Sequence, residues 1–151
     1  MCQHQNIVKL IDVYESPNET NIVLEYIEGK DLYSYVQERG TLPESRVKEI
    51  IRQLLQGIKY LNQFGIVHRD LKLANIMMSD DSDQAIPKIV DFGFSRFLSP
   101  QGTATEPFGT LGYAAPEILT QTPYSYKCDL WSVGCILFVL MCGKLPFDHA
   151  D

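Results

Sequence analysis

Three short stretches hold the residues best suited to chemistry, and they read HRDLKLAN at 68–75, DFG at 91–93 and APE at 115–117. The first brings the carboxylate of Asp70, the ammonium of Lys72 and the amide of Asn75 close together in the sequence. A carboxylate on a loop can orient a hydroxyl and accept its proton, and a nearby cation can stabilise negative charge. Asp91 adds a second carboxylate, and amide and carboxylate oxygens suit Mg²⁺. These residue types indicate acid–base chemistry beside a hard cation.

The order and form of the three stretches resemble the catalytic loop, the magnesium motif and the end of the activation segment of eukaryotic protein serine/threonine kinases. Taken alone, DFG is a turn signal and an Arg-Asp pair is usually a surface salt bridge. The longer loop and the ordered set are far more specific, and the resemblance extends over essentially the whole chain. It implies transfer of the γ-phosphate of ATP, with Mg²⁺, to serine and threonine hydroxyls of protein substrates.

The resemblance also implies roles for the polar residues. Asp70 matches the residue that orients the acceptor hydroxyl and accepts its proton, and Lys72 matches the cation that contacts the γ-phosphate. Asn75 and Asp91 match the Mg²⁺ ligands. Thr110, in GTLGY at 109–113, matches a threonine that contacts the catalytic aspartate in serine/threonine kinases. Tyrosine kinases carry a different sequence there, so serine or threonine specificity is expected.

The ATP site is expected to include the stretch LEYIEG at 24–29, which resembles the hinge between the two lobes of the family. By that match, Glu25 and Ile27 offer backbone groups to adenine. Asp31 reaches the ribose, and Met77 forms the floor of the pocket.

Five further residues match positions that support the active site in the family. Leu10, His68 and Phe92 match three members of the hydrophobic spine that aligns the site, although Leu10 equally suits an ordinary core. Asp129, in DLWSVG at 129–134, matches an aspartate that binds the backbone of the catalytic loop. Glu117 matches a glutamate that pairs with an arginine later in the domain, and a buried carboxylate without such a partner is costly.

Regulation is expected to involve Arg69, which directly precedes Asp70. In the family such an arginine is drawn into place by a phosphorylated residue of the activation segment. Glu106 stands where several calmodulin-dependent relatives carry a phosphorylatable threonine and calcium-dependent relatives carry an acidic residue. Glu106 is therefore expected to take the phosphate's part. The alternatives are a solvated Glu106 and phosphorylation at Thr103 or Thr105.

Two residues bear on the expected substrate preference. Phe94 directly follows DFG, and a large flat residue there accompanies a preference for serine over threonine in the family. Ala74 stands where many relatives have a glutamate that helps bind a substrate arginine, which weakens the case for basic substrates. The run YSYKCDLWS at 124–132 and GKLPF at 143–147 resemble calcium/calmodulin-dependent and calcium-dependent kinases. Neither an EF-hand nor an autoinhibitory segment occurs, so calcium or calmodulin control would act through regions outside this chain.

Composition argues against several other classes of function. The formal net charge is −6 and no basic run occurs, so neither nucleic acid nor a membrane surface is expected as a partner. The longest apolar stretch, 130–142, is too short to span a bilayer, and no signal peptide is visible at the start. A cytoplasmic location is expected, and an additional nuclear location stays open. Four cysteines occur without a C-x-x-C pair, and the three at a seven-residue spacing should be small buried side chains of one helical face: Cys128, Cys135 and Cys142.

Residue composition, turn signals and hydrophobic periodicity predict the elements that must position these residues. A β-hairpin is expected at 7–14 and 21–26, a short helix at 31–39, and a long amphipathic helix around 47–61. Thr41 and Glu44 have the spacing of a capping box for the long helix. Short strands follow at 66–67, 76–78 and 88–90, with SDDSD at 79–83 as a solvated turn. An irregular segment is expected at 94–114, and a helix buried on all sides at 129–142.

The expected fold class is α+β, a protein-kinase-like fold that is truncated to the end of the small β lobe, the hinge and the first half of the mainly helical large lobe. Residues 1–26 would be the remnant of the small lobe with the start of the hinge, and 27–151 the large lobe up to its central buried helix. No G-x-G-x-x-G occurs, and the strand lysine and helix glutamate that accompany it have no match, so this chain alone is expected to be inactive. A noncatalytic kinase-like interaction module and an inactive truncated fragment stay open as alternatives.

Overall fold

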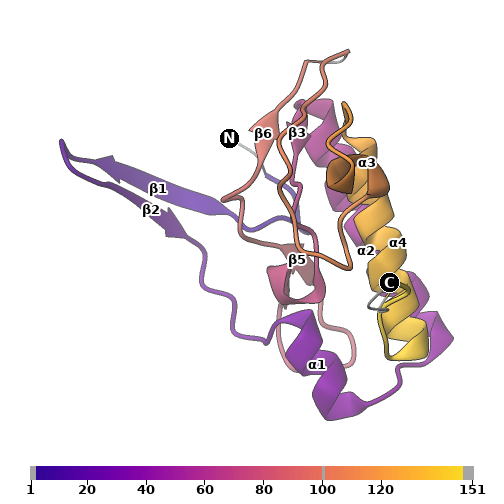
Figure 1. Ribbon diagram of the computed structural model, residues 1–151. Helices are drawn as coiled ribbons and strands as arrows, with labels where there is room; N and C mark the ends of the chain where they lie inside the picture. Colours follow the sequence, from indigo (N-terminus) through magenta and orange to yellow (C-terminus); the bar gives the residue numbers. More distant parts are fainter. Residues whose placement is uncertain (1–2, 100, 148–151) are drawn as a thin grey trace.

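The first part of the chain is a β-hairpin in the computed structural model, which describes residues 3–99 and 101–147. Strand β1 (Leu10–Glu15) pairs antiparallel with β2 (Thr20–Leu24), and this confirms the predicted hairpin. The hairpin extends away from the helices (Figure 1). Most of its apolar side chains are exposed, including Ile11, Tyr14 and Ile22. The hairpin therefore adds little to the hydrophobic core.

Two helices follow, and their boundaries have clear causes. Helix α1 (Leu32–Arg39) begins after Asp31, whose side chain accepts a hydrogen bond from the Ser34 backbone N–H at 3.0 Å. It ends at Gly40, whose φ of 69° is a left-handed conformation that glycine adopts without strain. Helix α2 (Glu44–Gln63) is amphipathic, as predicted, and its buried face includes Val47, Ile50, Leu54, Ile58 and Leu61.

Short strands and loops then bring distant parts of the chain together. Strand β3 (Ile66–Val67) pairs with β6 (Arg96–Phe97), and β4 (Ile76–Met78) pairs with β5 (Pro87–Ile89), both antiparallel. The single-turn helix η1 (Leu73–Asn75) leads directly into β4. The backbone N–H of Val90 donates to the carbonyl of Asn75 at 3.0 Å, so the residue before Asp91 lies beside the end of the catalytic loop.

The remaining helices complete the core. Helix α3 is a single turn (Pro116–Leu119), and α4 (Lys127–Cys142) lies alongside α2 (Figure 1). The main core joins buried residues of α1, α2, η1, β4, β5 and α4. A second, smaller core lies around the activation segment and contains Val67, Ala104, Ala114, Ala115, Ile118, Tyr124 and Cys128. The chain is thus mixed helix and strand with mainly helical packing, as expected.

Two local predictions are wrong at the ends of elements. Helix α2 starts at Glu44 with Pro43 as its N-cap and has no side-chain cap, so Thr41 and Glu44 do not form a capping box. Glu44 is the first helical residue rather than the third, because Pro43 is extended and its φ of −58° suits the position before a helix. The segment at 94–114 was expected to be irregular throughout, but it contains β6.

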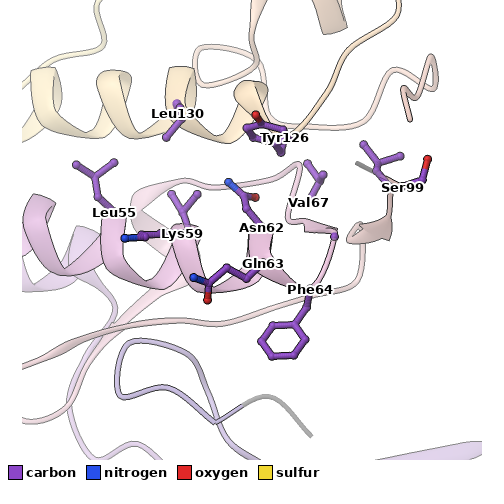
Figure 2. A pocket seen from close by; sticks show the side chains of 12 residues that line it. Leu55, Lys59, Asn62, Gln63, Phe64, Val67, Ser99, Tyr126 and Leu130 are labelled. Carbon is purple, nitrogen blue, oxygen red and sulfur yellow. The ribbon is translucent and has the colours of Figure 1, made fainter. Parts of the chain in front are cut away.

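Helix α4 is also less buried than its composition predicted. One face packs in the core, while the opposite face exposes large apolar side chains such as Leu130, Leu137 and Met141. Cys128 and Cys135 are buried, but Cys142 is exposed because it is the last residue of the helix, so the prediction of three buried cysteines fails there. Between α2 and α4 a pocket of about 710 Å³ opens, with Leu55, Lys59, Asn62 and Leu130 in its lining (Figure 2). None of the residues expected in the active site lines it.

Two wider searches of the described residues are negative. None of their helices combines the length and the apolar character that a membrane crossing requires. Nor do the described residues contain a group of three or more histidine, cysteine, aspartate or glutamate side chains placed to hold a metal ion by themselves.

Candidate active site

The catalytic loop forms a compact polar cluster around Asp70, which is 5% exposed. Thr110 donates its hydroxyl hydrogen to Asp70 Oδ1 at 2.6 Å. Lys72 Nζ donates to Asp70 Oδ2 at 2.9 Å and also to Thr110 Oγ1 at 2.9 Å. Asn75 Nδ2 donates to Asp70 Oδ2 at 3.0 Å and to the Asp70 carbonyl at 2.8 Å. Four residues predicted from motifs in different parts of the sequence thus meet at one carboxylate.

The electrostatics of this cluster favour an ionised Asp70. Burial opposes ionisation, but the hydrogen bonds from Thr110 and Lys72, together with the charge of Lys72 and the hydrogen bond from Asn75, hold the pKa of Asp70 below its ordinary value. A carboxylate that is ionised at neutral pH can accept a hydrogen bond from a hydroxyl and then its proton. The arrangement therefore provides an oriented base with a cation beside it.

Asp129, near the start of α4, fixes the backbone of the catalytic loop. Its carboxylate accepts the backbone N–H of His68 at 2.8 Å and that of Arg69 at 2.9 Å. Asp129 is fully buried, which raises its pKa, and the two N–H donors offset part of that effect. Arg69 has a φ of 71°, a conformation that costs energy for a residue with a side chain. The bonds to Asp129 hold the backbone in this strained turn.

His68 links the catalytic loop to the segment that carries Asp91. Its Nε2 lies 3.0 Å from the carbonyl of Val90, and its Nδ1 lies 3.3 Å from the backbone N–H of Asp70. The His68 ring contacts the ring of Phe92 edge to face, with centroids 5.0 Å apart. Two of the three expected spine residues are therefore in contact. The third, Leu10, begins β1 and is paired there with Leu24.

Asn75 and Asp91 carry side-chain oxygens of the type that Mg²⁺ prefers. The Asn75 amide nitrogen faces Asp70, and its oxygen accepts no hydrogen bond from the described residues. Asp91 is exposed, has a φ of 59°, and binds the Gly93 N–H through Oδ1 at 3.1 Å. Mg²⁺ keeps waters and phosphate oxygens around one or two protein ligands, and the Asn75 amide oxygen and the Asp91 carboxylate are ligands of a type that it accepts.

The expected nucleotide residues are in the segment between β2 and α1 and on β4. The Glu25 backbone N–H donates to the Lys9 carbonyl at 2.9 Å, while no described group donates to the Glu25 carbonyl or accepts from the Ile27 N–H. Asp31 pairs with Met77 in an isolated antiparallel bridge, which brings the end of the hinge onto β4. The Asp31 carboxylate is occupied by the N–H and the hydroxyl of Ser34, so it acts as the helix cap in this structure.

Comparison with known proteins decides the family. The pattern of the protein kinase domain matches residues 1–151, the whole chain. The chain belongs to the protein kinase family. The expected kinase-like fold is thereby confirmed, and this family generally uses ATP and Mg²⁺.

Serine/threonine kinases are among the relatives of this kinase chain. Serine/threonine-protein kinases ATG1b and ATG1c of Arabidopsis thaliana are each 46% identical over 144 residues, which cover 95% of this chain and 20% of the relative. Calcium/calmodulin-dependent protein kinase type IV of Mus musculus is 40% identical over 144 residues, 95% of this chain and 31% of the relative. The expected likeness to calmodulin-dependent kinases is confirmed. The chain spans between a fifth and a third of the length of these relatives.

The activation segment of this kinase surrounds Arg69. Glu106 Oε2 lies 3.7 Å from Arg69 Nη1, and Glu106 also forms an ion pair with Arg96. A hydrogen bond from its own backbone N–H lowers the pKa of Glu106; partial burial opposes this, and the charge of Arg96 adds to it. Thr103 and Thr105 are exposed. The structure therefore places the expected acidic residue beside Arg69 and leaves both threonines accessible.

The predicted role of Glu117 stays a prediction, and four other residues were not predicted from the sequence. No described cation forms an ion pair with Glu117, whose carbonyl accepts the Thr122 N–H at 3.0 Å. Sequence analysis missed Lys88, which pairs with Glu25 at 2.8 Å, and Arg96, Phe108 and Tyr124, which lie around Arg69 or Glu106. Lys88 and Arg96 are cations close to DFG, a signal that could have found them. Phe108 and Tyr124 read as ordinary aromatic residues of a loop.

Proposed function

We propose that the full-length protein transfers the γ-phosphate of ATP to serine and threonine hydroxyls of protein substrates. The observation that carries this proposal is the meeting of Asp70, Lys72 and Thr110, whose polar atoms lie 2.6–2.9 Å apart although Thr110 is 40 residues from Asp70 in the sequence. The serine/threonine kinases that resemble this chain support the choice of acceptor.

The roles of the residues follow from this geometry. Thr110 and Asn75 orient the Asp70 carboxylate, which then accepts a hydrogen bond from the acceptor hydroxyl. Asp70 takes the hydroxyl proton as the new O–P bond forms, while the bond between the γ-phosphorus and the bridging oxygen breaks and ADP leaves with that oxygen. Lys72 Nζ donates to the same Asp70 carboxylate. Its positive charge can therefore balance negative charge on the transferred phosphoryl group. Asp129 contributes indirectly, because it fixes the backbone that presents Asp70.

The remaining residues suit the binding of ATP, the phosphate donor, and of Mg²⁺. Asn75 and Asp91 would hold Mg²⁺, which when bound neutralises negative charge on the phosphates. The Glu25 carbonyl and the Ile27 N–H are available to adenine, and Met77 is half-buried beneath the hinge. Asp31 would reach the ribose only after releasing part of its cap on α1.

The direct test is phosphate transfer by the full-length protein from labelled ATP to peptides that differ only in a serine, threonine or tyrosine acceptor. Incorporation into serine and threonine, dependent on Mg²⁺ and lost in Asp70→Asn, supports the proposal. Incorporation that persists in Asp70→Asn, or that occurs mainly on tyrosine, contradicts it.

Serine should be the better acceptor. Phe94 is 44% exposed next to the DFG motif and stacks on Phe108 with centroids 5.3 Å apart, so the two rings present a flat apolar surface that an acceptor residue could meet. The extra methyl group of threonine would meet this surface. The same peptides measure the preference, and Phe94→Val should shift it towards threonine. A threonine preference in the unaltered protein would refute the role of Phe94.

Activation should not require phosphorylation of the segment, because Glu106 already supplies a carboxylate to Arg69 and Arg96. Glu106 is 42% exposed, and exposed ion pairs contribute little on average, so the contribution must be measured. The test uses phosphate-free full-length protein. Loss of activity in Glu106→Gln supports the proposal. An unchanged Glu106→Gln, together with a phosphorylated preparation that Thr103→Ala or Thr105→Ala silences, contradicts it.

A relative supports a proposal on how the protein is controlled, and the free cysteines support one on its location in the cell. One relative is named as a calcium/calmodulin-dependent kinase, so calcium or calmodulin control through regions outside this chain is part of the proposal. Cys128, Cys135 and Cys142 are free thiols, which fits a reducing compartment such as the cytoplasm or the nucleus. Calmodulin-dependence of the full-length protein's activity, with and without calcium chelation, tests the first point, and localisation of a tagged protein tests the second.

A further inference from the structure

Arg69 is a buried cation that activation-segment groups surround on several sides. Its side chain is 7% exposed. Nε donates to the Phe94 carbonyl at 2.6 Å, Nη1 donates to the Tyr124 hydroxyl at 3.1 Å, and the guanidinium lies 4.7 Å from the centre of the Phe108 ring. Glu106 is farther away, at 3.7 Å. A neutral hydroxyl is therefore a closer partner of this cation than the carboxylate is.

Tyr124 occupies a junction between three segments. The residue is 2% exposed, and its hydroxyl accepts from Arg69 and donates to the carbonyl of Glu106 at 2.8 Å. Its backbone pairs with Ala104 through two hydrogen bonds of 2.9 Å each. Tyr124 thus holds the activation segment on both sides of Thr105 while it contacts the residue that precedes the catalytic base.

We propose that Tyr124 is a positioning residue whose hydroxyl couples the activation segment to the catalytic loop. This inference rests on the proposed kinase function. The Glu106 carbonyl accepts two hydrogen bonds, one from Tyr124 and one from the Phe108 N–H at 2.9 Å. Removal of the hydroxyl leaves a buried arginine donor and a carbonyl lone pair without these partners, which is costlier than the loss of an exposed contact.

The effect reaches the base through a short path. Phe108 stacks beneath Arg69, and Thr110 follows two residues later and donates to Asp70. When the Tyr124 hydroxyl is absent, the stretch 106–110 loses one of its anchors, and the oriented state of Asp70 becomes less populated. The described hydrogen bonds of Glu25 are to Lys9 and Lys88, and none joins the hinge to this path. Turnover should therefore fall while the KM for ATP stays unchanged.

Tyr124→Phe in the full-length protein is the decisive variant, because it removes one oxygen atom and keeps the ring in the second core. Tyr126→Phe is the matched control, since Tyr126 is an exposed tyrosine two residues away. We expect kcat to fall about tenfold in Tyr124→Phe, the equivalent of one buried hydrogen bond to a charged group. Tyr126→Phe should stay within twofold of the unaltered protein, and the KM for ATP should be the same in all three.

Hydrogen exchange provides a readout that does not depend on activity. The backbone amides at 104–110 should exchange faster in Tyr124→Phe, with no change in α2. Unchanged kcat and unchanged exchange would overturn the proposal, because they would mean that Tyr124 only packs. Faster exchange throughout the protein would also overturn it, since it would indicate general destabilisation. If the unaltered protein transfers no phosphate, the proposed function fails, and the exchange at 104–110 alone decides the role of Tyr124.

Discussion

The catalytic loop (68–75) and the DFG loop (91–93) each supply a carboxylate, but the structure surrounds the two groups very differently. Asp70 is 5% exposed and accepts hydrogen bonds from Thr110, Lys72 and Asn75. Asp91 is exposed, and the one described hydrogen bond to its side chain comes from the Gly93 N–H at 3.1 Å. One carboxylate is fixed by the protein, whereas the other faces outward.

This difference fits the different roles that we propose for the carboxylates of Asp70 and Asp91. A base that must meet a hydroxyl in line with a phosphate has to be oriented before the reactants arrive, because misplacement by about 1 Å costs about a hundredfold in rate. A metal ligand has its geometry completed by the ion and the phosphates that the ion carries. This contrast supports the roles that we propose, with the base in the loop that has more internal hydrogen bonds and the Mg²⁺ ligand in the open loop.

The largest effect should come from Asp91. Asp91→Ala in the full-length protein should nearly abolish turnover, because it removes a charged ligand of Mg²⁺ that no neighbouring carboxylate of the described DFG loop replaces. Rates measured over a range of Mg²⁺ concentrations check this. Turnover close to that of the unaltered protein at any Mg²⁺ concentration would refute the assignment of Asp91.

The next largest effect should come from the fixed carboxylate. Asp70→Asn keeps the shape of the side chain but removes the base, so kcat should fall by roughly 10²–10⁴-fold. Asp81→Asn, in the exposed turn between β4 and β5, is a matched control that should leave kcat unchanged. A kcat for Asp70→Asn within a few-fold of normal would show that the oriented carboxylate is not the base.

A smaller effect should appear in the pH dependence of stability. Because the pKa of Asp70 is lower in the folded protein than its usual 3.8, its ionised form stabilises the fold above that pH, and the contribution is lost as the pH falls through the lower folded-state value. Urea unfolding should therefore show a stability difference between the unaltered protein and Asp70→Asn that is greatest above about pH 5 and shrinks on acidification. Thr110→Val, which removes a donor to Asp70, should reduce this pH dependence. A difference that is constant from pH 3 to pH 7 would contradict it.

Much of the site was predictable because its residues lie in short stretches with distinctive spacing. Asp70, Lys72 and Asn75 are in one loop, and the β4–β5 hairpin returns the chain so that Val90 bonds to Asn75. Apolar periodicity identified α2, and two runs rich in β-branched residues around a turn identified the β1–β2 hairpin. Local sequence is sufficient where the partners are neighbours or are joined by a tight turn.

The contacts that sequence analysis missed join distant segments. Arg69 meets Tyr124 across 55 residues, and Glu25 meets Lys88 across 63. Each of these residues has an ordinary interpretation by itself, and only the packed chain brings them together. Helix α4 shows the reverse case, because an apolar composition indicates burial but does not say which face is covered. Its exposed Leu137 and Met141 could not be told from buried Val133 and Ile136 by residue type.

The most direct measurement is the binding of Mg²⁺-ATP to the full-length protein and to its two carboxylate variants. If Asp70 is a preoriented base and Asp91 a metal ligand, Asp70→Asn should bind Mg²⁺-ATP with a Kd within about twofold of the unaltered protein while turnover is lost. Asp91→Ala should lose the part of the affinity that depends on Mg²⁺. Equal weakening of Mg²⁺-ATP binding by both substitutions, or none by Asp91→Ala, would contradict the division of roles between the two loops.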